Sequence, residues 1–101
     1  MRKIINKKLY DTSAAKRIGS YSYGRCGDLD FVEETLYRKH TGELFLHGTG
    51  GPKSRYATRC SYNEWGGGEA ILCVPDFDPE RWVEEHLDAD TYIELFGPVE
   101  E

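Results

Sequence analysis

Alternating apolar and polar positions predict a hairpin in the middle of the chain. Residues 31–39 and 43–47 are rich in aromatic and branched side chains, and a three-residue connection ending in Gly42 separates them. Glycine in such a connection supplies the positive φ that the turn needs. Both faces of the hairpin carry large apolar groups, so we predict that it is central and covered on more than one side. The expected cross-strand pairs are Tyr37 with Phe45, Thr35 with His47, Leu36 with Leu46 and Arg38 with Leu44.

The first third of the chain predicts a hairpin, a short helix and a loop. Asn6-Lys7-Lys8 separates two apolar pairs, and asparagine tolerates the left-handed backbone of a tight turn. Asp11 or Thr12 can cap a helix over residues 13–18, and the glycine that follows can end it. Residues 19–29 are polar and aromatic, so we expect them to form a loop.

The last third predicts a strand and two helices. Residues 70–74 form an apolar run of the kind found in buried strands. Asp78-Pro79 is a strong helix start, because aspartate caps the first turn and proline suits the first helical position. Asp88 can cap a second helix over residues 89–96, which Gly97 would end. We expect the segment between the glycine-rich loop and this strand, residues 54–64, to be irregular.

The predicted elements follow the order ββαβββαα. Strands that are grouped together, with helices toward the ends, are typical of an α+β fold. We therefore expect a small antiparallel sheet of about five strands, with a short N-terminal helix and two C-terminal helices. The 101 residues suffice for one modest core, so residues 1–101 are expected to form a single domain.

Charge is distributed unevenly along the chain, whose net charge is −5. Residues 1–25 carry seven Lys/Arg against one acid, whereas residues 76–101 carry ten acids against one Arg. Such asymmetry can steer a partner toward one face. Alternatively, the two ends attract each other and help to close the fold, although exposed ion pairs contribute only about 0–1 kcal/mol each.

Hydropathy and cysteine usage predict a cytoplasmic protein that does not enter a membrane. The chain contains no apolar run as long as the roughly 18 residues of a membrane span. Its first residues are basic like those of a signal peptide, but no apolar stretch follows them. An odd number of widely spaced cysteines, Cys26, Cys60 and Cys73, favours free thiols in a reducing compartment.

The run HGTGGPKS at residues 47–54 has part of the pattern of a phosphate-binding loop. Such a loop needs glycine directly before its lysine, so that backbone N–H groups converge on the anion. Pro52 occupies that position and has no N–H to donate. We therefore interpret the run as a surface loop of turn residues.

The spacing of the histidines and cysteines predicts no metal site and no cofactor. His40, His47 and His86 form no recognisable ligand pair with one another or with a cysteine. His47 and Cys60 could form a nucleophile–base pair if the glycine-rich loop folds back. A small hydrolase or transferase thus remains an alternative, but we expect a protein that is not an enzyme.

Basic and aromatic residues allow a second alternative, a small nucleic-acid-binding regulator. Cations beside aromatic rings suit stacked bases, whereas the acidic last quarter of the chain would repel phosphate. The residues concerned are Lys7, Lys8, Lys53, Arg55, Arg59, Tyr56, Tyr62 and Trp65.

A protein-binding module is the interpretation that we favour. Tyr, Trp and Arg often dominate the binding energy of interfaces, and an acidic helical face can occupy a basic groove made for nucleic acid. The alternative is that the aromatic side chains merely cover a thin core. The expected partner-binding residues are Glu84, Glu85, Asp88, Asp90 and Glu94 for electrostatics, and Tyr56, Trp65 and Arg55 for contact.

Three runs cover nearly the whole chain, namely KIINKKLYDTSAAKRIGSYSYG, EETLYRKHTGELFLHGTGGPKSRYA and WVEEHLDADTYIELFG. Together they resemble a group of small proteins from phages and mobile elements of Gram-positive and gut bacteria. This resemblance implies a mobile-element setting in a bacterial host cell. By its size, setting and acidity the protein is similar to inhibitors of host defence, including anti-CRISPR proteins. We therefore expect it to bind and occlude a nucleic-acid-guided complex, such as CRISPR–Cas subunits.

Overall fold

The computed structural model describes residues 1–25 and 27–101, so the expected thiol at Cys26 lies outside the described residues. Over these residues, eight strands form three antiparallel sheets, and two helices follow them. The elements are β1 (Arg2–Ile5), β2 (Lys8–Asp11), β3 (Lys16–Tyr23), β4 (Val32–Arg38), β5 (Leu44–Gly50), β6 (Thr58–Ser61), β7 (Glu64–Gly66), β8 (Gly68–Leu72), α1 (Pro79–His86) and α2 (Ala89–Phe96).

A four-stranded antiparallel sheet with the order β3-β4-β5-β8 forms the centre of the molecule. The predicted hairpin lies at its middle as β4 and β5, and all four expected cross-strand pairs are present. Both faces of this hairpin are covered, as the apolar groups on its two sides predicted. The register is fixed because a slip by one residue would exchange the two faces of every strand.

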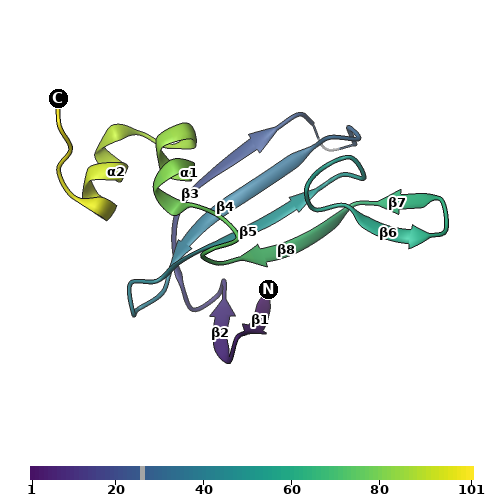
Figure 1. Ribbon diagram of the computed structural model, residues 1–101, viewed down its shortest axis with the longest axis horizontal. Helices are drawn as coiled ribbons and strands as arrows, with labels where there is room; N and C mark the ends of the chain where they lie inside the picture. The colour runs from purple at the N-terminus through teal and green to yellow at the C-terminus, as the bar shows by residue number, and fades with distance from the viewer. Residues whose placement is uncertain (26) are drawn as a thin grey trace.

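The helices and the N-terminal hairpin cover opposite faces of the central sheet (Figure 1). On the helical side, Leu36 and Leu46 of the sheet pack in one cluster with Trp82 and Val83 of α1. On the other side, Phe45 packs in a second cluster together with Tyr10 of β2. Burying each such side chain contributes about 1.5–3 kcal/mol, so the sheet holds the N-terminal hairpin and the helices in place.

The predicted N-terminal helix is wrong. Residues 16–23, which were divided between that helix and a loop, form the edge strand β3. This strand pairs along the whole length of β4, with a register shift between Arg17 and Gly19. A helix of less than two turns is marginal by itself, whereas the strand gains a full ladder of backbone hydrogen bonds. Alternation of Ser and Tyr over residues 20–23 is the signal of period two that favours a strand.

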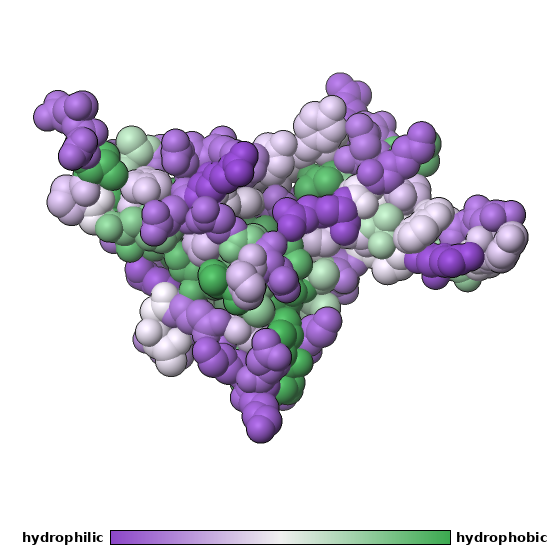
Figure 2. Space-filling model, in the orientation of Figure 1, coloured by the Kyte–Doolittle hydropathy of each residue, from purple (hydrophilic) through white to green (hydrophobic). Residues whose placement is uncertain are grey.

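The expectations of about five strands and of an irregular segment 54–64 were also wrong. Residues 58–66 form the hairpin β6–β7, a two-stranded sheet of its own. Together with the additional β3, it raises the number of strands within residues 1–25 and 27–101 to eight. The hairpin stands out from the body as a narrow arm (Figure 2). The mixed α and β composition and the two C-terminal helices are confirmed.

Local signals at the ends of the elements are confirmed. Asp78 accepts a hydrogen bond from the backbone N–H of Arg81, and Asp88 accepts one from that of Thr91, at 3.3 and 2.8 Å. In the first hairpin, Asn6 and Lys7 have φ angles of 51° and 66°. Two successive residues with positive φ match the twist of the flanking strands.

The peptide bond between Val74 and Pro75, in the connection from β8 to α1, is cis.

Candidate protein-binding surface on the C-terminal helices

A buried carboxylate fixes α1 to the central sheet. Glu34 of β4 is only 4% exposed. The indole Nε1 of Trp82 donates to its Oε1 at 3.0 Å, and the hydroxyl of Tyr56 donates to its Oε2. The guanidinium of Arg55 lies 3.6 Å from the same Oε2. Burial of a charged group is tolerated because it is paired and hydrogen-bonded in this way.

The side chain of Tyr56 lies in the interior, although it was expected to contact a partner. It is 4% exposed, and its ring packs directly over Gly48, where any side chain would collide with it. Burial and the hydrogen bond to Glu34 raise the pKa of the Tyr56 phenol well above its usual range. Gly48 of the HGTGGPKS run thus gives space to an aromatic ring of the core, and it lies in β5 and not in the expected surface loop.

The five acidic residues expected to bind a partner are exposed on α1, on α2 and at the junction between them. Of these five acids, only Glu85 forms an ion pair within the described residues. It pairs with Arg81 at 2.8 Å and with His86 at 3.9 Å. Partial burial, together with the negative charges of Glu80, Glu84 and Asp78, raises the pKa of the Tyr92 phenol. The five residues are Glu84, Glu85, Asp88, Asp90 and Glu94.

In the described part of the chain, the basic N-terminal segment forms no ion pair with these acids. Arg2 pairs with Asp11 at 3.4 Å, and Lys8 lies 3.9 Å from Glu43. Within residues 1–25 and 27–101, no ion pair joins the basic first quarter to the acidic last quarter. Lys16 and Arg17 line a small cavity with Glu94, without pairing with it. Among the described residues, the two ends thus approach each other at this cavity without a direct ion pair.

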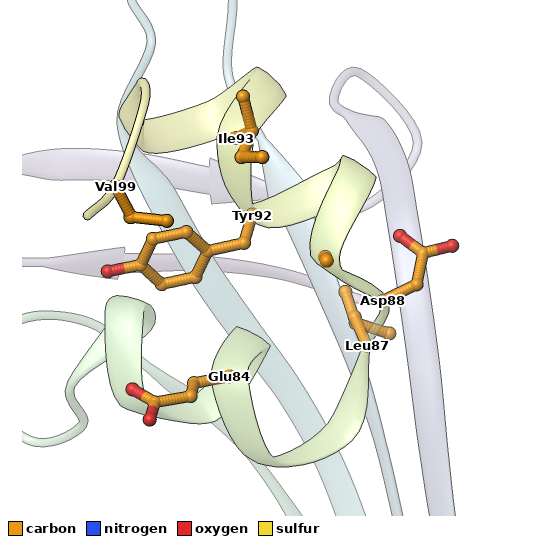
Figure 3. Close-up of a pocket in the computed structure, with 7 residues that line it drawn as sticks. Glu84, Leu87, Asp88, Tyr92, Ile93 and Val99 are labelled. Atoms are coloured by element: carbon orange, nitrogen blue, oxygen red, sulfur yellow. The ribbon is translucent and has the colours of Figure 1, made fainter. Parts of the chain in front are cut away.

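An apolar crevice opens between the two helices, with a volume of about 380 Å³. Figure 3 shows the ring of Tyr92 at its centre, between Val99 of the C-terminal tail and Glu84 of α1. Ile93 is 44% exposed and Val99 57% exposed. Exposed apolar side chains that gather in a concave site are typical of binding surfaces. The crevice is lined by Glu84, Leu87, Asp88, Ala89, Tyr92, Ile93 and Val99.

A second cavity, of about 290 Å³, lies beside α1 above the buried Glu34. Arg55 and Glu85 both line it, so the structure brings together one residue expected for contact and one expected for electrostatics. His86 closes one side, where its ring stacks on that of Tyr21 with the centroids 3.8 Å apart. The lining carries charges of both signs, unlike the lining of the crevice between the helices.

Trp65 lies far from the acidic helices. It is 59% exposed on β7, and the arm and α2 lie at opposite ends of the long axis of the molecule (Figure 1). That axis extends over 48 Å. Tyr62 at the tip of the arm is 83% exposed, with the guanidinium of Arg59 5.8 Å from its ring centroid. Of the expected partner-binding residues, Trp65 is therefore separated from the five acids of the helical end, and Tyr56 is buried.

His47 and Cys60, the residues of the enzyme alternative, have other contacts. His47 Nε2 lies 2.9 Å from Glu69 Oε2. Cys60 is an exposed free cysteine on β6, and its Sγ lies 3.8 Å from the carbonyl oxygen of Thr58.

In the described part of the chain, no three His, Cys, Asp or Glu side chains are grouped as metal ligands. None of the described helices has the length and apolar character needed to cross a membrane.

Sequence reasoning missed Glu34. A glutamate beside a second glutamate in an alternating strand has the pattern of a solvated position. Its two neutral partners lie 22 and 48 residues away, so no local spacing could reveal the cluster. The alternation itself was a signal, because it places Glu34 on the same face as Leu36.

Comparison with known proteins gives this chain no relative. No family model matches it, and no significant match to a curated protein or to a solved structure was found.

Proposed function

We propose that the protein is a non-enzymatic binding protein whose acidic helical face docks on a basic surface of a partner protein. One observation supports this proposal most directly. The acids on α1 and α2 are exposed, and within the described residues only Glu85 of the five forms an ion pair. Like charges crowded on one surface repel one another. A cationic partner would relieve this repulsion and would be steered to the face over long distances.

The proposed target is a nucleic-acid-guided defence complex in the cytoplasm of a bacterial host cell. Such a complex holds its nucleic acid in a positively charged channel, which suits an acidic competitor. The protein would act as an inhibitor by occluding that channel, as the resemblance to mobile-element proteins implies. The arm with Trp65 would then contact a second region of the same complex.

Charge reversal on the helices tests this function. We would replace Glu84, Asp90 and Glu94 by lysine and leave Asp88 unchanged, because Asp88 caps α2. The matched control reverses three exposed acids elsewhere, Asp30, Glu33 and Glu64. Each tagged protein is incubated with a nuclease-treated lysate that contains a CRISPR–Cas system, and captured proteins are identified by mass spectrometry.

Wild type and control should both capture Cas subunits. The amount captured should fall as salt is added, because the electrostatic screening length shortens from about 10 Å at 0.1 M to about 3 Å at 1 M. The helix variant should lose this capture while keeping the circular dichroism spectrum of the wild type. Equal capture by both variants would contradict the acidic-face function. Capture of other proteins only would contradict the proposed target.

The exposed arm favours a second candidate function, binding of single-stranded nucleic acid. Its support is the pairing of Arg59 with the exposed ring of Tyr62, next to Trp65. Base stacking on such rings contributes about 1–3 kcal/mol per base. Trp82 is buried, so an oligonucleotide that binds the arm should quench mainly the fluorescence of Trp65, and Trp65→Ala should abolish the effect. Unchanged fluorescence at low salt would remove this candidate.

A further inference from the structure

The crevice between α1 and α2 combines an apolar floor with acidic edges. Leu87, Tyr92, Ile93 and Val99 supply the apolar side chains, and Glu84 lies at one edge. Asp88 lies at the junction of the helices, where hydrogen bonds from Thr91 lower the pKa of its carboxyl group. Glu84 and Asp88 thus place two carboxyl groups at the rim of the crevice.

We infer that this crevice is an anchor pocket for a large apolar side chain of a basic segment in the partner. The inference rests on the proposed function and deepens it, since it names the chemistry of the partner. Lysine or arginine residues beside the anchor would face Glu84 and Asp88. A basic amphipathic helix, with leucine or a similar residue on its apolar face, has this pattern.

The size and position of the crevice support an anchor of this kind. Its volume of about 380 Å³ lies within the range of about 300–1,000 Å³ typical of ligand pockets. Ile93 and Val99 remain about half exposed, so an inserted side chain would bury apolar surface on both. Removal of this apolar surface from water would stabilise the complex.

Charge decides which partner suits the crevice. A second copy of this chain would bring a net charge of −5 toward a face that is already negative. A neutral apolar segment would leave the acids at the edge without partners. A segment that is both basic and apolar would pack its apolar side chains on the crevice floor and pair its cations with the acids at the edge. Protein interfaces typically have complementary electrostatic potentials of this kind.

Two synthetic peptides of equal charge separate the crevice from the acidic face. The first is a helical peptide of about 15 residues with lysines on one face and leucines on the other. The second has serine at every leucine position. Each is titrated into the full chain, and methyl NMR signals of Leu87, Ile93 and Val99 report occupation of the crevice. The leucine peptide should bind at least about tenfold more tightly than the serine peptide, a difference of 1.4 kcal/mol.

A variant that fills the crevice provides the matched control. Ala89→Trp adds bulk to the lining without changing any charge, and should weaken the leucine peptide about tenfold while leaving the serine peptide unaffected. Equal binding of both peptides, or methyl shifts confined to residues outside the crevice, would overturn the anchor pocket. That result would not contradict the acidic-face function. The acidic-face function is contradicted only if the charge-reversed helix variant captures its partner as well as wild type does.

Discussion

Glu34 shows how one residue can couple segments that are far apart in sequence. Its carboxylate joins β4 to Trp82 of α1 and to Tyr56 of the loop before β6. Residues buried with such partners are costly to alter, because a lost partner leaves a polar group unsatisfied. The position of α1, and with it the candidate binding surface, depends on this contact.

Tyr56→Phe tests the contact directly. The substitution removes the hydroxyl that donates to Glu34 and keeps the ring that fills the space over Gly48. We expect the free energy of unfolding to fall by about 1–3 kcal/mol, measured by urea denaturation at neutral pH. The same change at Tyr62, which is 83% exposed, should alter it by no more than about 0.5 kcal/mol. Equal effects of the two substitutions would show that the Glu34 contact contributes nothing.

Two buried tyrosines should make stability sensitive to alkaline pH. Burial and the hydrogen bonds to Glu34 and Glu43 raise the pKa of Tyr56 and Tyr10. The folded protein therefore holds these protons more tightly than the unfolded chain does, so their contribution is complete below a pH of about 10 and decreases as the pH rises further.

Urea midpoints measured from about pH 8 to about pH 11 check this dependence. Wild type should lose stability with increasing slope above the tyrosine pKa of the unfolded chain. Tyr56→Phe should lose stability less steeply, because the Tyr56 proton is no longer involved. An identical slope in both proteins would refute the role assigned to Tyr56.

At the scale of elements, short-range chemistry decided the turns and caps, and long-range pairing decided the strands. Asp78 and Asp88 begin their helices as their positions before Pro79 and Ala89 indicate. Strand β3 could not be assigned in this way, because its gain comes from pairing with β4. Local preference for a short helix is weak compared with such tertiary interactions.

The turn of the first hairpin can be improved. Lys7 has a φ angle of 66°, a conformation that costs a residue with a Cβ about 1–2 kcal/mol. Lys7→Gly relieves this cost but adds freedom to the unfolded chain, so we expect a gain of a few tenths to about 1 kcal/mol in thermal or urea unfolding. Lys3→Gly, within β1, should instead destabilise by about 0.5–1 kcal/mol. Destabilisation by Lys7→Gly would contradict the importance of backbone strain at this turn.

At the scale of the whole molecule, charge and aromatic side chains are separated. The acids gather on the helices at one end, and Tyr62 and Trp65 project on the arm at the other (Figure 1). A partner that contacts both would have to extend along the 48 Å axis. A partner that docks on the helices alone, as proposed, would not need this length.

Repulsion within the acidic face should be measurable without any partner. Glu84→Gln with Glu94→Gln removes two charges near the C-terminal ends of α1 and α2, where negative charge is unfavourable. We expect this variant to melt at a higher temperature than wild type in low salt. The difference should vanish at about 1 M salt, where the screening length is about 3 Å. Glu33→Gln on the sheet serves as control, and a gain that persists in high salt would argue against repulsion as its cause.

The sequence by itself determined the features that depend on neighbours in the chain. The register of β4 and β5, the tight first turn and both helix starts follow from alternation, turn chemistry and capping. The five acids were identified from charge density, and the structure shows them to be exposed; that they bind a partner stays a prediction.

Only the tertiary structure decided where these features meet. It buried Tyr56 with Glu34, formed the crevice of α1, α2 and Val99, and placed Trp65 at the far end. These outcomes depend on contacts between residues that are tens of positions apart in the sequence. Such contacts form only when the sheet brings the residues together. A local pattern carries no record of them, because each residue is compatible with many distant neighbours until packing selects one.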